Sequence, residues 1–176
     1  QMKNLLYIGN KLSKHGFSFF TIETLGPLLE KEGFKLSYAS SKKNKIVRLL
    51  VMLFQTIKLR KKVDFLLIDT YSTSNFWYAF LVSQLARMLN LKYIPILHGG
   101  NLPERLMKNP KTCRLIFKNS YKNIAPSIYI LEAFAKAGFE NTDYIPNSIE
   151  IENYSFEKRA FAVPKLLWVR AFAKIY

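Results

Sequence analysis

Short apolar runs alternate along the chain with longer segments in which apolar residues recur at helical spacing. The apolar runs end on glycine or polar residues and predict strands at 5–8, 34–39, 65–68, 93–97, 123–125 and 144–145. The longer segments predict helices at about 21–31, 46–61, 74–90 and 127–138, with further helical segments that are broken at Pro110. Residues suited to helix ends stand at their borders: Gly33, Ser74 or Asn75, Ser127 and Gly138.

This alternation predicts an α/β fold with a single Rossmann-like doubly wound parallel sheet of about six strands and helices on both faces. The strands are nearly continuous apolar runs, which is typical of a sheet that is covered on both faces. In such folds, ligands bind at the carboxyl ends of the strands. The unusual residues of this sequence fall there: Gly9-Asn10, Asp69-Thr70 and His98-Gly99-Gly100-Asn101.

The pattern changes after Asn147. Residues 150–159 are polar and irregular, and 165–169 then have the composition of a new strand close to the last residue, Tyr176. We therefore expect one domain over 1–150, and an interdomain linker with the start of a truncated second domain over 151–176.

Composition favours a packed core, because 49% of the residues are hydrophobic and 15% are aromatic. Cys113 is the only cysteine, so no intrachain disulfide can form and a reducing compartment fits. The first apolar run, Leu5–Ile8, is shorter than the apolar region of a signal peptide. We therefore expect a cytoplasmic protein, with peripheral attachment to the inner membrane face as a further expectation.

The formal charge of +15 predicts an anionic partner, which could be nucleic acid, an anionic membrane surface or a phosphorylated substrate. The alternative is that a lysine-rich surface reflects the composition of the source organism. The helix-like run Ile46–Phe54 bears on this question because it is apolar almost all round and has lysines on both sides. It is either a core helix or an element whose outer face enters an anionic membrane surface.

His98 is a candidate site residue because it ends a central strand and can form hydrogen bonds or titrate near neutral pH. Gly99 and Gly100 remove side chains beside it, so that a ligand can approach the backbone. The alternative is a glycine turn that carries a histidine with its hydrogen bonds satisfied.

The loop Gly9–Gly16 follows the first strand, where a dinucleotide-binding protein carries G-x-G-x-x-G. Its glycine spacing does not fit that motif, and Ala39-Ser40-Ser41 lacks the acidic residue expected after the second strand, which argues against NAD. An ordinary loop and a binding loop both remain open for Gly9–Gly16. No Cys/His cluster with metal spacing and no G-x-S-x-G motif occurs in the sequence, so a metalloenzyme or serine hydrolase has no support.

Several of these features together resemble the N-terminal domain of GT-B glycosyltransferases, in particular the retaining family 4 group. The resemblance covers nearly the whole chain and rests on the loop after the first strand, His98-Gly99, and Ile124-Ala125-Pro126-Ser127 before a helix that ends at Gly138-Phe139. Ile145-Pro146-Asn147-Ser148-Ile149 is similar to the family signature I-P-N-G-V. Residues 166–172 are similar to the first strand of the family's second domain, although an arginine and alanine replace the glycine and arginine of its V-G-R-F motif.

The resemblance implies a two-domain enzyme that transfers a sugar from a nucleotide diphosphate sugar to a glycan or lipid-linked acceptor, without another cofactor or a metal. The N-terminal domain would hold the acceptor, and a C-terminal domain with a glutamate pair would hold the donor. His98 matches a histidine that orients the reacting groups, and the leaving phosphate is thought to take the acceptor proton. The implied substrate-binding residues are Gly9, Asn10, His15, Gly16, Asp69, Thr70, Gly99, Gly100, Asn101 and Asn147. This chain alone should bind acceptor weakly and should not turn over.

A non-catalytic basic α/β module that binds nucleic acid is the alternative function. The sequence has no recognised RNA- or DNA-binding motif, and its lysines are scattered rather than gathered on one recognition helix. A Rossmann-type redox domain is a third alternative, which the glycine spacing disfavours.

Overall fold

The computed structural model describes residues 2–16, 20–147 and 155, and over these residues the chain forms an all-parallel six-stranded sheet flanked by helices. The predicted fold class, a doubly wound α/β sheet, is confirmed. The strands are β1 (Asn4–Ile8), β2 (Lys35–Ala39), β3 (Phe65–Tyr71), β4 (Lys92–His98), β5 (Asn123–Ala125) and β6 (Thr142–Tyr144). The helices are the short 3-10 helix η1 (Ser13–His15), α1 (Thr21–Lys31), α2 (Lys45–Leu59), α3 (Phe76–Met88), α4 (Leu102–Lys108), α5 (Pro110–Phe117) and α6 (Ile128–Lys136).

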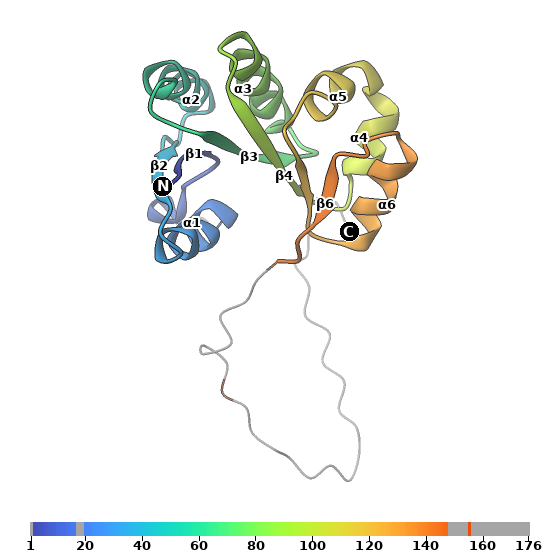
Figure 1. Ribbon diagram of the computed structural model, residues 1–176, viewed down its shortest axis with the longest axis horizontal. Coiled ribbons are helices and arrows are strands. Elements are labelled where there is room, and N and C mark those ends of the chain that lie inside the picture. The colour runs from blue at the N-terminus through green and yellow to red at the C-terminus, as the bar shows by residue number, and fades with distance from the viewer. Residues whose placement is uncertain (1, 17–19, 148–154, 156–176) are drawn as a thin grey trace.

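The strand order is β2-β1-β3-β4-β5-β6, so the chain first moves outward from β1 to β2 and then crosses back to β3. This reversal creates a topological switch point between β1 and β3, where crevices for ligands form in open α/β sheets. Helix α1 lies on one face of the sheet, whereas α2, α3 and α5 lie side by side on the other (Figure 1).

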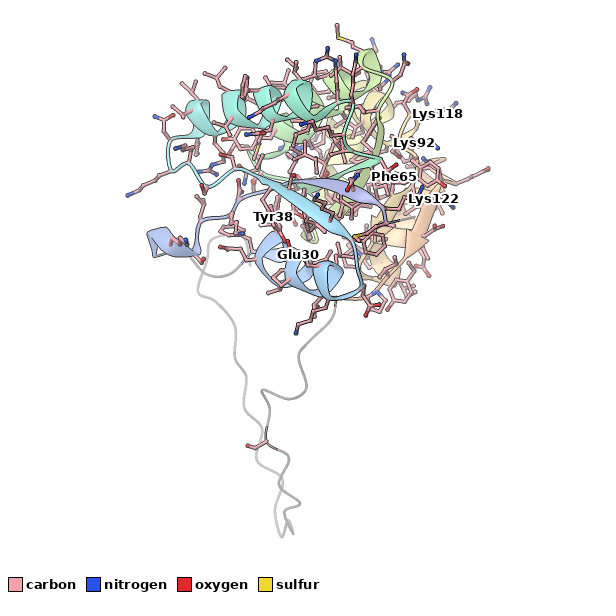
Figure 2. All side chains as sticks on the ribbon, turned by 60° about the vertical axis from the view of Figure 1, so that its left-hand side comes forward. Glu30, Tyr38, Phe65, Lys92, Lys118 and Lys122 are labelled. Atoms are coloured by element: carbon pink, nitrogen blue, oxygen red, sulfur yellow. The ribbon has the colours of Figure 1, made fainter. Side chains whose placement is uncertain are left out.

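Side chains of β1 alternate between the two faces and thereby join two separate cores. Leu6 and Ile8 pack with residues of α2 and α3, whereas Leu5 and Tyr7 pack toward Ile22 of α1. At the edge strand β2, Tyr38 lies over α1 in the direction of Glu30 (Figure 2). Gly26 of α1 makes room for it, because a Cβ there would stand 2.6 Å from the Tyr38 ring.

A third core joins β4 and β5 to the helices that follow them. Three aromatic rings form its centre, with ring centroids 4.9 Å apart for Phe117 and Phe134 and 5.7 Å apart for Phe117 and Phe139. The side-chain oxygen of Ser127 accepts from the backbone of Ile130 and caps α6, as the sequence predicts.

The two central strands are longer than predicted, and this difference matters for the site. The prediction ends them at Ile68 and Leu97, but β3 continues to Tyr71 and β4 to His98, with Tyr71 in register with His98. The backbone pairing therefore includes the polar residues on which the apolar runs end. The last strand, β6, ends at Tyr144, one residue earlier than predicted.

Several predictions for the C-terminal part of the chain, after Asn147, lie outside the described residues. They are the strand at 165–169, the domain border at 150–151, and Ser148 and Ile149 of the I-P-N-G-V resemblance. Each helix of the described part of the chain falls short of the length and apolarity that a bilayer crossing requires.

We predict that Phe134→Ala destabilises the fold by about 3–5 kcal/mol, since it opens a cavity in the aromatic core. Phe134 is fully buried, whereas Tyr129 on the same helix is 60% exposed. Tyr129→Ala is therefore the matched control and should change the free energy of unfolding by less than about 0.5 kcal/mol. Urea denaturation measures both variants, and equal effects would contradict this assignment of the core.

Candidate functional site

The most distinctive polar group of the protein is a buried pair formed by Asp69 and His98. Asp69 stands near the end of β3 and His98 ends β4, and the Nε2 atom of His98 lies 2.9 Å from Oδ1 of Asp69. The side chains are 1% and 9% exposed. Both project from the sheet face that carries α1, so they meet beside the switch point between β1 and β3.

Tyr7 of β1 completes this group, because its hydroxyl donates to the same Oδ1 atom of Asp69 at 3.1 Å. Burial and, after it, the neighbouring Asp69 raise the pKa of the Tyr7 phenol far above its ordinary value of 10. The phenol therefore remains protonated and serves as a donor. A carboxylate can only accept, so we assign the second proton to Nε2 of His98, which leaves Nδ1 with the lone pair in the neutral ring.

Tyr71 restrains the imidazole from its other side. Its ring stacks on His98 with a centroid separation of 4.8 Å and an interplanar angle of 27°. Burial, followed by the charge of Asp69, raises the pKa of the Tyr71 phenol above 10, so Tyr71 stays neutral. With one nitrogen bound and one face covered, His98 has little rotational freedom, which suits a side chain that must hold another group in a fixed position.

Gly9 stands against the second carboxylate oxygen of Asp69. A Cβ at position 9 would lie 2.4 Å from Oδ2, far inside contact distance, so only glycine fits beside this carboxylate. Oδ2 itself is buried and accepts no hydrogen bond from the described residues. Buried carboxylate oxygens are normally paired, and those that are not are frequent at functional sites.

Asn10 faces the opposite side of the loop and is held by a buried arginine. Its Oδ1 atom accepts from Nη1 of Arg48 at 2.8 Å, while other Arg48 nitrogens donate to the carbonyls of Lys42 and Lys43 at 2.7 and 2.8 Å. Arg48 is only 5% exposed, and these neutral acceptors satisfy it. Arg48 thus ties the loop after β1 to the loop after β2.

The turn after β4 is open next to His98. Gly99 has a φ of +87°, a conformation that favours glycine, and a Cβ at Gly100 would meet no atom within 4 Å. Asn101 is exposed at the start of α4 and makes no side-chain cap. The glycines therefore leave the backbone beside the imidazole accessible, as the sequence predicts.

The loop from Lys11 to Gly16 is anchored through Glu23 of α1. The Glu23 carboxylate accepts from the hydroxyl and the backbone of Ser13 and from the backbone of Phe20. Partial burial works to raise the pKa of Glu23, but these hydrogen bonds outweigh it and hold the pKa below its ordinary value of 4.5. His15 ends η1, and Gly16 follows it at a φ of +80°.

Two predicted site residues lie apart from this group. Thr70 is fully buried, and its hydroxyl donates to the carbonyl of Ile68 at 3.0 Å, because the alternation of β3 turns it to the face opposite Asp69. Asn147 lines a largely apolar groove of about 510 Å³ between α1 and the sheet. Leu67 and Ile96 line this groove too, and each precedes a member of the pair by two residues on the same sheet face.

The structure also identifies residues that the sequence prediction missed, namely Tyr7, Tyr71, Arg48 and Glu23. Tyr7 and Tyr71 lie in strands, where a tyrosine usually packs as an apolar residue, so no sequence signal separated them from the core. Arg48 offered a signal, because it is the one charge between Ile46 and Phe54 in an otherwise apolar run.

The described residues hold no cluster of three or more histidine, cysteine, aspartate or glutamate side chains that could bind a metal. No model of a known protein family matches the chain, and no curated protein sequence matches it either.

We predict that Gly9→Ala displaces the Asp69 carboxylate and costs about 1–3 kcal/mol of stability, because the added methyl overlaps Oδ2. Gly100→Ala is the control, since its Cβ has open space, and should stay within about 0.5 kcal/mol of wild type. In an Asp69→Ala background, Gly9→Ala should cost less, because the clashing oxygen is gone. Additive effects of the two changes in urea denaturation would contradict this contact.

We predict a pH-dependent contribution of Glu23 to stability. Its folded pKa is lowered, so the contribution is fully present above the unfolded pKa of about 4.5 and is lost as the pH falls through the folded pKa. The difference in unfolding free energy between wild type and Glu23→Gln should therefore be present at neutral pH and shrink in acid. A difference that does not change with pH would contradict the assigned hydrogen bonds.

Proposed function

We propose that the chain is the acceptor-binding domain of a retaining glycosyltransferase of the GT-B type. The observation that carries the proposal is the buried Asp69–His98 pair at the carboxyl ends of β3 and β4, next to the switch point. The resemblance of the loop after β1, of His98-Gly99 and of Ile145-Pro146-Asn147 to that family supports it. The nucleotide sugar would be bound by a second domain that closes over this edge.

His98 orients the reacting groups in this proposal. Asp69 holds Nε2, so Nδ1 of the imidazole is offered to a hydroxyl of the acceptor or of the donor sugar. Gly99 and Gly100 let the sugar approach the backbone beside it. Asp69 and Tyr71 act as positioning residues for the imidazole in this proposal.

The reaction exchanges one bond for another at the anomeric carbon of the donor sugar. The bond between this carbon and the phosphate oxygen breaks, and a bond to the acceptor oxygen forms. The acceptor proton passes to the leaving phosphate, so His98 need not act as the base. Its contribution is to place the acceptor hydroxyl and to support the charge that develops during transfer.

Helix α2 does not line this site, but its residue Arg48 connects the helix to the loop after β1. Arg48 holds Asn10, which follows Gly9 directly. A change at Arg48 would therefore disturb the backbone at Gly9, beside the Asp69 carboxylate. The groove lined by Leu67 and Ile96 lies on the same sheet face as the pair and gives room for a larger acceptor there.

We predict that His98→Ala lowers sugar transfer by about 100-fold or more in the protein that carries this domain together with its donor-binding domain, while the fold is retained. Transfer from labelled nucleotide sugars measures the rate, and thermal unfolding checks the fold. Tyr129→Ala on the distant surface of α6 is the control and should keep full activity. Unchanged turnover of a folded His98→Ala protein would overturn the site, and transfer by the 176-residue chain alone would overturn the need for a donor domain.

A further inference from the structure

The outward side of α2 is apolar, although it faces away from the core. Arg48, Met52 and Thr56 occupy its inner side and are buried. The opposite side carries five apolar residues that are 44–71% exposed: Ile46, Val47, Leu50, Phe54 and Ile57. A surface helix normally presents polar residues there, so this helix has a second apolar face without a partner among the described residues.

The neighbouring helix α3 extends this surface. The two helices pack side by side, and the hydroxyl of Tyr78 in α3 donates to the Lys45 carbonyl at 3.1 Å. The outward side of α3 also carries apolar residues that are more than a third exposed: Trp77, Leu81 and Met88. We call the outward sides of α2 and α3 with these eight residues the apolar ridge; the two helices lie at the top of Figure 1.

Basic residues surround the apolar ridge. They stand just before α2, at its two ends and just after it, at the end of α3, and on or directly after α5: Lys42, Lys43, Lys45, Lys58, Arg60, Lys61, Lys62, Arg87, Lys111, Arg114 and Lys118. Residues 33–63, 72–91 and 109–122 contain no aspartate or glutamate at all. Among the described residues, this face therefore combines an apolar centre with a rim of one charge sign.

This arrangement favours one class of partner over the others. Nucleic acid needs cations along its backbone and rings that stack on successive bases, whereas the ridge carries no cation at its centre and only two of its eight residues, Phe54 and Trp77, are aromatic. A second copy of the chain would bring two basic rims together, which repel. An anionic bilayer surface fits both the apolar ridge and its basic rim, because the acyl region accepts apolar side chains and the headgroups attract lysine and arginine.

We propose that the apolar ridge docks this protein on the surface of a membrane that contains anionic lipid. Helices α2 and α3 lie in the plane of the interface, with Leu50 and Phe54 inserted and the lysines of the rim at headgroup level. Trp77, which is 46% exposed, lies at the border between the headgroups and the acyl chains, where tryptophan is favoured.

The docked helix α2 is linked to the candidate site, although the Asp69–His98 pair lies on the opposite face of the sheet. The amino end of α2 follows β2 and therefore lies at the carboxyl edge of the sheet, the same edge as His98. Arg48 ties this end directly to Asn10, since its donors reach both Asn10 and the carbonyls of Lys42 and Lys43. Membrane docking is independent of the proposed sugar transfer, and either can fail without the other.

Vesicle sedimentation of the 176-residue chain tests the proposal. The protein should pellet with vesicles of phosphatidylcholine and phosphatidylglycerol, and not with phosphatidylcholine alone, and added salt should weaken binding. In a Trp168→Phe background, where Trp77 is the only tryptophan, the emission should shift to the blue on binding. Absence of binding to the anionic vesicles, or equal binding to both kinds, would overturn the proposal.

Surface variants identify the docking face. Leu50→Ser combined with Phe54→Ser should weaken binding by about tenfold or more, because both side chains lose their apolar burial. Ile128→Ser combined with Tyr129→Ser on α6 is the matched control, since those residues are 49% and 60% exposed, and it should bind as wild type. All these positions are exposed, so the variants should unfold at unchanged temperature. Equal binding of the two double variants would overturn the assignment to α2.

Charge variants distinguish the rim from the overall charge. Lys58→Glu with Lys61→Glu should weaken binding more than Lys31→Glu with Lys136→Glu, which changes the same number of charges away from α2. Equal losses would overturn a defined docking face. A dimer that the Leu50 and Phe54 changes abolish, or a salt-sensitive shift of DNA or RNA without vesicle binding, would assign the ridge to those partners instead.

Discussion

The carboxylate of Asp69 is buried at the end of β3, and much of the local structure follows from keeping a charged group there. A buried carboxylate is costly unless donors replace its lost water, and Tyr7 and His98 supply two of them to a single oxygen. The other oxygen lies so close to the backbone of Gly9 that no side chain fits between them. Three neighbouring strands are thus linked at one point, and the imidazole of His98 is fixed by the same contact that stabilises the charge.

This linkage explains why polar residues extend the strands instead of ending them. Asp69 and His98 project to the same sheet face, and Tyr71 stacks on His98 only because β3 and β4 remain paired to their last residues. The other face at this height carries Thr70, whose hydroxyl is satisfied by its own strand. One face therefore carries the Asp69–His98 pair and the other carries a hydroxyl that is satisfied by the backbone, and the alternation of side chains along β3 separates them.

The hydrophobic pattern predicted the fold class and the approximate place of each strand, because short apolar runs between helical segments admit few other architectures. Strand-end reasoning also found Gly9, Asp69, His98 and Gly99, which the fold brings together. It could not find Tyr7, because the sequence does not distinguish a strand tyrosine that only packs in the core from one that also donates a hydrogen bond to Asp69. It included Thr70 because adjacency along the chain says nothing about which sheet face a residue occupies. Only the pairing of strands decides that.

The sequence of α2 left two interpretations open, a core helix or a membrane-facing one, and the structure shows a helix that is buried on one side and apolar but exposed on the other. Its inner side is buried at Met52 and Thr56, and Met52 packs with residues of β1 and α3, which a core helix requires. Its outer side keeps Leu50 and Phe54 in solvent, at a cost that a soluble fold does not need to bear. Arg48 is the one charged residue within Ile46–Phe54, and it is buried and donates to Asn10. The exposed side of that run therefore carries no charge. A helix that served only the core would be expected to carry its charge on the outer side. The position of Arg48 therefore supports a partner for the apolar ridge more directly than the overall charge of the chain does.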